Sequence, residues 1–231
     1  MITIENLKKA YGSEVVLDID RLEIPSGECF GLVGNNGAGK TTLFRLMLDM
    51  IRPTDGKVLI NGRDVREDEE WKRYVGSYLD EHSLVDFLTP NEFFRFLAKI
   101  YNLSTDDLKN HLGKFEDLFQ GEILNRNKYI RDLSRGNMKK VGIASAMIAF
   151  PDIVMLDEPF ENLDPSSQIK LKKMIHQEMA DRKVTFLISS HDLNHVTDVC
   201  ERIVLLEKGK AIKDIAGDEN TLATLEAYFQ Q

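Results

Sequence analysis

The sequence predicts an α/β fold in which a parallel sheet carries an N-terminal antiparallel β subdomain and an inserted helical subdomain. Short β-branched runs dominate the first part, and helical periodicity without a convincing strand extends from about residue 81 to 140. Farther along, strand-like and helix-like segments alternate, as in parallel sheets. A chain of 231 residues has room for one such domain, so we expect residues 1–231 to form a single unit.

Gly, Pro and Asp residues divide the chain into short segments whose composition predicts their type. In the first part, β-branched runs bounded by these residues indicate largely antiparallel strands at 2–4, 15–24 and 57–60. In the last part, a strand at 153–156, a helix at 165–181 and a strand at 184–190 resume the alternation of a parallel sheet. The helical region between these parts is interpreted as an insertion.

The composition is that of an ordinary water-soluble globular protein, with 42% hydrophobic and 29% charged residues. The longest apolar runs are strand-sized and the N-terminus lacks a leader pattern, so we expect no membrane span. A formal net charge of −8 argues against nucleic acid as a partner. The pairs Lys8–Lys9 and Lys139–Lys140 are interpreted as solvated faces. Cys29 and Cys200 lack metal-ligand spacing, which favours small buried side chains.

A glycine-rich segment fits a phosphate-binding loop, because it follows the strand Cys29–Val33 and opens a helical pattern. Its sequence, GNNGAGKTT, matches GxxxxGK[ST], in which glycines let backbone N–H groups turn toward phosphate oxygens. The helix N-terminus adds partial positive charge there. Lys40 is predicted to reach the β- and γ-phosphates, and the Thr41 hydroxyl to ligate magnesium. A glycine-rich turn that binds no ligand is the alternative interpretation, but such a turn does not need to lie between a strand and a helix. The predicted binding residues are Gly34, Asn35, Asn36, Gly37, Ala38, Gly39, Lys40, Thr41 and Thr42.

Two adjacent carboxylates follow the strand predicted at 153–156. In a parallel sheet this position lies at the carboxyl edge, where ligands bind. Asp157 is therefore predicted to hold magnesium, directly or through water, and Glu158 to polarise the attacking water. Adjacent carboxylates also cap helices or remain solvated, but the phosphate loop favours the catalytic interpretation. The sequence thus predicts a nucleoside triphosphate and Mg²⁺ as ligands.

A short segment after the helical region carries a family resemblance. Residues 133–138, LSRGNM, resemble the LSGGQ signature that separates the ABC ATPase family from other phosphate-loop enzymes, and the similarity extends over nearly the whole chain. The resemblance implies ATP as the nucleotide and a head-to-tail dimer, in which Ser134 and Gly136 of one subunit cap the γ-phosphate bound by another. A hydroxyl and a backbone amide at a helix N-terminus are suitable anion ligands.

Three further segments match the family in the expected order. Tyr11 resembles the aromatic residue that stacks on adenine, and ENLDP at 161–165 resembles the dimer-contacting loop. His191 in SSHDL resembles the switch histidine that senses the γ-phosphate, so the resemblance implies catalytic roles for Lys40, Glu158 and His191. Taken alone, Tyr11 also fits an ordinary packed aromatic, and His191 fits a neighbour of a helix cap.

Several positions depart from the family pattern. Asp80 stands where we align the glutamine that links magnesium to the membrane partner, although a carboxylate can reach the metal through water. Arg135 and Asn137 replace Gly and Gln in the signature. Glu161 and Asn162 replace the usual Ser and Gly of the dimer loop. Since Asn keeps hydrogen-bonding capacity, we expect ATPase activity to survive these changes.

The resemblance implies an ATP-hydrolysing subunit that powers a membrane transporter through nucleotide-driven dimerisation of cassettes. The expected partners are a separately encoded transmembrane permease and a second cassette, identical or different, with this chain in the cytoplasm on the inner face of the cell membrane. The segment LTPNEFFRFLAKIYNL resembles exporter cassettes, but an amphipathic helix packing Phe side chains into a core gives the same pattern. The alternative function is a soluble ABC ATPase, for example in cofactor assembly. A regulatory module without turnover conflicts with the joint presence of Lys40, Asp157, Glu158 and His191.

Overall fold

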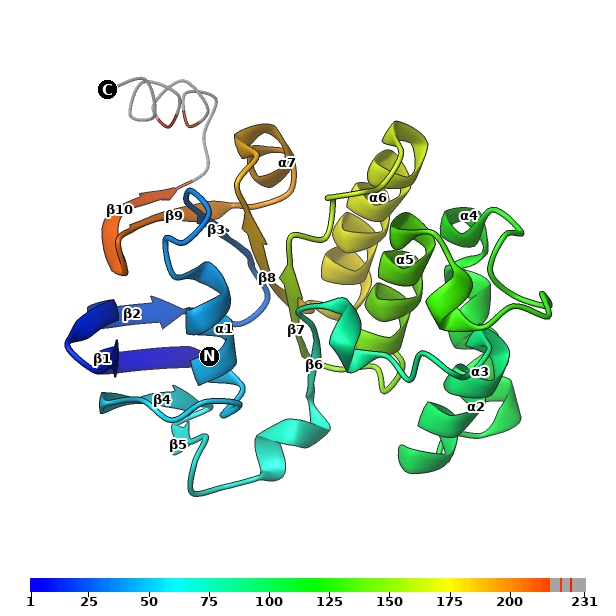
Figure 1. Cartoon of the computed structure of the whole chain (residues 1–231), viewed down its shortest axis with the longest axis horizontal. Helices are drawn as coiled ribbons and strands as arrows, with labels where there is room; N and C mark the ends of the chain where they lie inside the picture. The colour runs from blue at the N-terminus through cyan, green and yellow to red at the C-terminus, as the bar shows by residue number, and fades with distance from the viewer. Residues whose placement is uncertain (217–220, 222–224, 226–231) are drawn as a thin grey trace.

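Two sheets and a group of helices make up residues 1–216, 221 and 225, the part of the chain that the computed structural model describes (Figure 1). The larger sheet has the strand order β10-β9-β3-β8-β7-β6. Strands β3, β6, β7, β8 and β9 pair in parallel, which confirms the predicted parallel sheet, and β10 pairs antiparallel with β9. The predicted unit 1–231 includes C-terminal residues that lie outside the described part. The strand bounds are Cys29–Val33 for β3, Val75–Tyr78 for β6, Ile153–Asp157 for β7, Thr185–Ser190 for β8, Arg202–Glu207 for β9 and Lys210–Ala216 for β10.

The smaller sheet is the predicted N-terminal antiparallel subdomain. Its strands, in the order β2-β1-β4-β5, pair antiparallel throughout. Strand β1 continues well beyond the apolar run 2–4 that predicts it. The sequence does not indicate this extension, because the second half of the strand is mostly half-buried and polar and gives no apolar signal. The bounds are Ile2–Tyr11 for β1, Glu14–Ile24 for β2, Asp55–Ile60 for β4 and Arg63–Asp64 for β5.

Three helices follow strands of the parallel sheet. Helix α1 spans Lys40–Met47, directly after the loop that leaves β3. Helix α6 spans Pro165–Arg182, and it begins where the sequence predicts because Asp164 caps its N-terminus, accepting from the Ser167 N–H at 3.0 Å. A short helix α7, Leu193–Thr197, follows β8. Among the described residues, no helix has the length and apolarity needed to cross a membrane.

The helices predicted between residues 81 and 140 gather at one side of the parallel sheet, in green in Figure 1. Thr89 and Ser104 begin two of them with capping boxes. The last helix continues past residue 140, because its C-terminal half packs against β6 and β7 of the parallel sheet. The bounds are Pro90–Ile100 for α2, Thr105–Lys114 for α3, Glu116–Phe119 for α4 and Arg135–Ala146 for α5, with 3₁₀ turns at Glu70–Arg73, Glu81–Ser83 and Ile130–Asp132.

The two cysteines are buried, as the sequence predicts, and they are also neighbours. Cys29 and Cys200 are free thiols whose Sγ atoms lie 3.2 Å apart. Burial raises the pKa of the Cys200 thiol, which disfavours the reactive thiolate. The contact joins the start of β3 to the segment before β9, across a separation of 171 residues that no sequence spacing reveals.

Candidate active site

The loop between β3 and α1 is the centre of the candidate site, and glycine permits its shape at two positions. Gly39 precedes α1 with a φ of 109°, a conformation that other residues rarely adopt. A Cβ at Gly34 would lie 2.3 Å from the Leu206 carbonyl oxygen, so only glycine lets the loop pass β9. Between them, Asn35 to Gly37 are exposed. The loop therefore presents an accessible surface beside a helix N-terminus, which is suited to phosphate.

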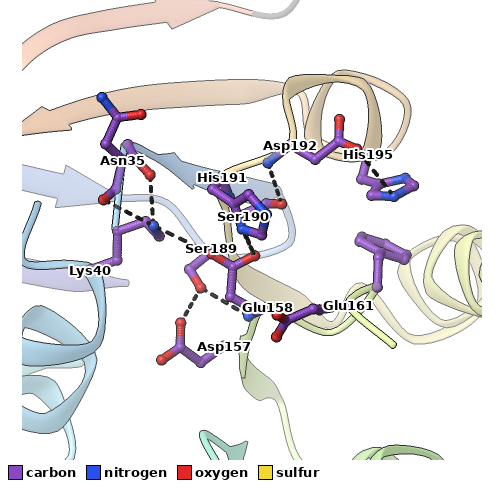
Figure 2. Close-up of polar contacts among 12 residues, drawn as sticks. Asn35, Lys40, Asp157, Glu158, Glu161, Ser189, Ser190, His191, Asp192 and His195 are labelled. Carbon is purple, nitrogen blue, oxygen red and sulfur yellow. Dashed lines mark hydrogen bonds and ion pairs between the residues drawn. The ribbon is translucent and has the colours of Figure 1, made fainter. Parts of the chain in front are cut away.

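Lys40 supplies a buried cation to this loop. Its side chain is 6% exposed, and its Nζ donates to the Gly34 carbonyl oxygen at 2.6 Å. The same Nζ lies 3.3 Å from Glu158 Oε1, so an ion pair joins the loop to the end of β7 (Figure 2). A buried ammonium needs carbonyl or anionic partners of this kind, and phosphate oxygens offer the same chemistry.

Asp157 ends β7 and accepts hydrogen bonds from two hydroxyl groups. Thr41 Oγ1 donates to Asp157 Oδ2 at 2.5 Å, and Ser189 Oγ at the end of β8 donates to Oδ1. Burial raises the pKa of Asp157, and the two hydroxyl groups oppose that rise because they stabilise the carboxylate. Thr41 and Asp157, both predicted magnesium ligands, are therefore in contact. Ser189 is not among the predicted residues, although its place beside His191 in SSHDL is a usable signal.

Glu158 faces His191 at the carboxyl edge of the sheet. Its Oε2 lies 3.0 Å from His191 Nδ1 and accepts from the His191 backbone N–H at 3.3 Å. Glu158 has a φ of 47°, in the left-handed region that non-glycine residues seldom occupy. The Glu158 N–H donates to Ser189 Oγ at 3.0 Å, which helps to hold this backbone. Figure 2 shows that Lys40, Glu158 and His191 form one connected group.

Asp80 lies in a cavity of about 370 Å³ that Asp157 and Glu158 also line. Its Oδ2 is 3.3 Å from the Arg45 guanidinium of α1, and its Oδ1 accepts from the His82 N–H at 3.0 Å. Arg45, which sequence analysis does not single out, therefore pairs with the carboxylate at the expected glutamine position. Within residues 1–216, 221 and 225, no group of three or more His, Cys, Asp or Glu side chains could hold a metal ion alone.

The signature segment lies at the N-terminus of α5 and borders another open cavity of about 370 Å³. Ser134 is the N-cap, and its Oγ accepts from the Asn137 N–H at 3.3 Å. Ser134 and Gly136 line this cavity, whereas residues 34–42 do not. A Cβ at Gly136 would lie 2.6 Å from the Asn162 carbonyl oxygen, so α5 packs closely on the segment after β7. Within one chain, the signature therefore borders a surface that the phosphate loop does not share.

Tyr11 lies at the end of β1, and its side chain is 56% exposed. Lys9 Nζ lies 4.7 Å from the centroid of the Tyr11 ring and donates to the Arg52 carbonyl oxygen at 2.7 Å. Such exposure does not fit an ordinary packed aromatic of the core. An exposed aromatic ring is available to stack on a planar ligand.

The prediction that Lys139 and Lys140 form a solvated face is wrong. Their side chains are only 8% and 4% exposed. Lys139 Nζ donates to the Glu158 carbonyl oxygen at 2.6 Å and lies 3.7 Å from Glu161 Oε2, while Lys140 Nζ lies 3.8 Å from Asp164 Oδ2. Both ammonium groups tolerate burial because α5 packs against a segment that supplies carbonyl and carboxylate partners.

A phosphate loop between the parallel strand β3 and α1, with two carboxylates at the end of β7 in the same sheet, defines the class of phosphate-loop nucleoside triphosphatases. The family model described as ABC transporter matches residues 17–161. The chain belongs to this family: it is an ABC ATPase, an ATP-binding subunit of membrane transport.

ATP-binding proteins of ABC transporters are similar over most of the chain. Identity is 33% over 212 residues to the uncharacterized ABC transporter ATP-binding protein YhaQ of Bacillus subtilis (strain 168), covering 92% of this chain and 70% of the relative. The bacitracin transport ATP-binding protein BcrA of Bacillus licheniformis is 30% identical, with 94% and 70% covered. The methionine import ATP-binding protein MetN of Carboxydothermus hydrogenoformans is also 30% identical, with 93% and 66% covered. A solved ATP-binding subunit of an ABC transporter superposes with a TM-score of 0.87 at 25% identity over the full length of both chains.

Proposed function

We propose that this ABC ATPase hydrolyses ATP with the residues that meet at the carboxyl edge of β3, β7 and β8. The observation that carries the proposal is the position of the Glu158 carboxylate, which lies within 3.3 Å of both Lys40 Nζ and His191 Nδ1. In this proposal Lys40 binds the β- and γ-phosphates, and Glu158 orients the attacking water and accepts its proton. His191 contacts the γ-phosphate and keeps the carboxylate in place.

The proposed ligands are ATP and Mg²⁺. Residues 34–42 surround the phosphates, and the exposed ring of Tyr11 stacks on adenine. Magnesium fits the chemistry of the donor set, because the Thr41 hydroxyl and the Asp157 carboxylate are neighbouring hard oxygen ligands. Asp80 contributes through water from the adjoining cavity. Bound magnesium neutralises charge on the phosphates.

The remaining part of each site comes from a second cassette in our proposal. Ser134 and Gly136 cap the γ-phosphate held by the partner, which the separation of their surface from residues 34–42 supports. Arg135 is exposed at the same helix N-terminus and adds positive charge toward that phosphate. The second cassette is a copy of this chain or a related one.

The proposed partner is a separately encoded transmembrane permease, which this chain contacts from the cytoplasmic face of the membrane. Residues 1–231 act as one cassette, with the helices at about 81–140 as a subdomain. ATP-driven closing and opening of the cassette dimer moves the permease. The net charge of −8 supports a role without nucleic acid.

We propose export as the direction of transport. Support comes from the resemblance of residues 88–103 to exporter cassettes. Phe93 and Phe94 of this segment are buried, so packing accounts for part of the pattern. The test is ATP addition to inverted membrane vesicles that contain the complex, with their contents compared by mass spectrometry. ATP-driven accumulation inside the vesicles supports export, and ATP-driven loss from them contradicts it.

The catalytic proposal is tested with Glu158→Gln, which keeps the size of the side chain and removes the proton acceptor. We expect turnover to fall by about 10²–10⁴-fold while ATP binding is kept. Glu116→Gln changes an exposed carboxylate on α4 and serves as the control. Near-normal hydrolysis by Glu158→Gln would remove Glu158 from the catalytic role.

Partnership with a permease is tested by isolating the tagged native protein in mild detergent and identifying the proteins that accompany it. We expect a polytopic membrane protein in stoichiometric amount. A protein that stays in the aqueous fraction without such a partner would contradict the proposal.

A further inference from the structure

Lys139 reaches from the signature helix α5 to the turn that follows β7. Its Nζ donates to the Glu158 carbonyl oxygen at 2.6 Å, and the Glu161 N–H donates to the same oxygen at 3.2 Å. The side chain is 8% exposed and borders the cavity that Asp80 and Asp157 also line. Lys139 thus buries its ammonium group against the main chain of Glu158, whereas most lysines extend into solvent.

The backbone that Lys139 contacts is held in an uncommon conformation. Glu158 has a φ of 47° and Asn162 a φ of 63°, so both ends of this turn are left-handed without glycine. Such conformations cost free energy and persist only where surrounding contacts determine them. Ser189 accepts the Glu158 N–H, and Lys139 donates to the Glu158 carbonyl oxygen, so the peptide groups on both sides of this Cα are fixed.

A second contact joins the same helix to the same turn. A Cβ at Gly136 would lie 2.6 Å from the Asn162 carbonyl oxygen, so α5 and the turn cannot separate or slide without disturbing both. Ser134, at the start of this helix, is exposed. The signature N-terminus and the Glu158 backbone are therefore mechanically connected within one chain.

We propose that Lys139 is a positioning residue that fixes the Glu158 backbone and transmits displacement of the signature helix to it, an inference that rests on the proposed catalytic role of Glu158. Contact of a partner's nucleotide with Ser134 then affects the orientation of Glu158 in the same subunit.

The charges around Lys139 agree with this assignment. Burial lowers the pKa of its ammonium, whereas Glu161, Glu158, Asp157 and Glu81 oppose that effect. Arg135 borders the same cavity from the preceding turn of α5. Carboxylates on several elements thus partly offset the cost of burying the Lys139 ammonium.

The test uses Lys139→Met, which removes the ammonium from a side chain of similar length. We expect kcat to fall about tenfold or more, because a hydrogen bond from a charged donor is lost. The KM for ATP stays near the wild-type value, because the contact of Lys139 is with the Glu158 backbone. Lys139→Arg, which restores charge and donors, returns kcat toward the wild-type value.

Lys172→Met is the control, because it removes a largely buried ammonium on α6 whose partner is Asp198. We expect its kcat and its KM for ATP to stay near the wild-type values. Thermal unfolding checks the fold of both variants, since replacing a buried ion pair by an apolar side chain is often neutral. If Lys139→Met does not fold, Lys139→Gln keeps a donor without the charge, and a smaller loss of kcat at an unchanged KM is expected.

The outcomes separate this inference from the proposed function. Wild-type kcat in Lys139→Met, together with loss of turnover in Glu158→Gln, overturns the positioning role and leaves the catalytic role of Glu158. Normal turnover in Glu158→Gln overturns both. A loss of kcat that Lys172→Met shares, or that Lys139→Arg does not reverse, shows only structural damage and also overturns the inference.

Discussion

The sheet edge and the signature helix hold their polar groups in opposite ways. At the sheet edge, Lys40, Glu158 and His191 contact one another within a single chain. At the N-terminus of α5, Ser134 caps its own helix, and the side chains of Ser134 and Arg135 are exposed. An internally connected group can orient a bound nucleotide within its own subunit, whereas an exposed helix terminus offers its ligands to another molecule. We therefore expect nucleotide binding to depend on the sheet edge and not on the signature helix, and dimerisation to depend on both regions.

The largest expected effect is at the sheet edge, with Lys40→Ala. The change removes the buried ammonium that the loop places beside Glu158, and we expect turnover to fall by about 10²–10³-fold. The fold is kept, because glycines rather than Lys40 determine the path of the loop. Steady-state hydrolysis and circular dichroism are the measurements, with Lys172→Ala, far along the chain on α6, as the control. Unchanged hydrolysis would show that the phosphate-loop assignment is wrong.

A smaller effect is expected in the helical subdomain, where acid lowers the free energy of unfolding because it weakens the packing of α3 on α5. His111 is 1% exposed, its Nε2 lies 2.8 Å from the Ala144 carbonyl oxygen, and its ring packs against Phe115 and Phe150. Burial lowers the pKa of His111 to about 4. An unfolded imidazole has a pKa near 6.5, so the unfolded chain binds more protons between these values. Stability is therefore full above about pH 6.5 and falls toward pH 4, by about 3 kcal/mol at most from this group.

The measurement is the free energy of unfolding of wild type and His111→Phe at pH 7 and pH 4. Phenylalanine fills the same space between the neighbouring rings but does not titrate. We expect the variant to lose less stability on acidification than wild type. Equal losses would mean that His111 is not the group through which acid acts on these helices.

The smallest effect is expected at Tyr11, in the antiparallel subdomain. Tyr11→Ala removes an exposed ring, and loss of base stacking, worth about 1–3 kcal/mol, raises the Kd for ATP roughly tenfold. Tyr11→Phe keeps the ring and the wild-type affinity. Titration of a fluorescent ATP analogue measures both. Equal affinity in Tyr11→Ala and wild type would remove Tyr11 from the nucleotide site.

The parts of the site that local sequence order determines could be predicted. A strand, a glycine-rich loop and a helix follow one another along the chain, so residues 34–42 and their place before α1 are readable. Asp157 and Glu158 end an apolar strand, which places them at the carboxyl edge of a parallel sheet. The fold class follows from the same alternation of strands and helices.

Contacts between distant segments could not be predicted in this way. The Arg45–Asp80 pair joins residues that are 35 apart, and the bond from Lys139 to Glu158 spans 19. From the sequence, the adjacent Lys139 and Lys140 are expected on a solvated face. Their burial follows from the packing of α5 on the turn after β7, which the sequence does not show. The helical region extends past residue 140 for a related reason. Residues on both sides of position 140 belong to α5, which packs on both the subdomain and the sheet.

The central claim is that ATP binds within one chain and that the signature acts on the nucleotide of another. The most direct measurement is the mass in solution of Glu158→Gln and of Glu158→Gln combined with Ser134→Asp, each with and without Mg²⁺ and ATP. Aspartate still caps α5 but places negative charge where the partner's phosphate would bind. We predict that Glu158→Gln is monomeric without nucleotide and dimeric with ATP, and that the double variant binds ATP with unchanged affinity yet stays monomeric. An ATP-dependent dimer of the double variant, or loss of its ATP affinity as a monomer, would contradict the claim.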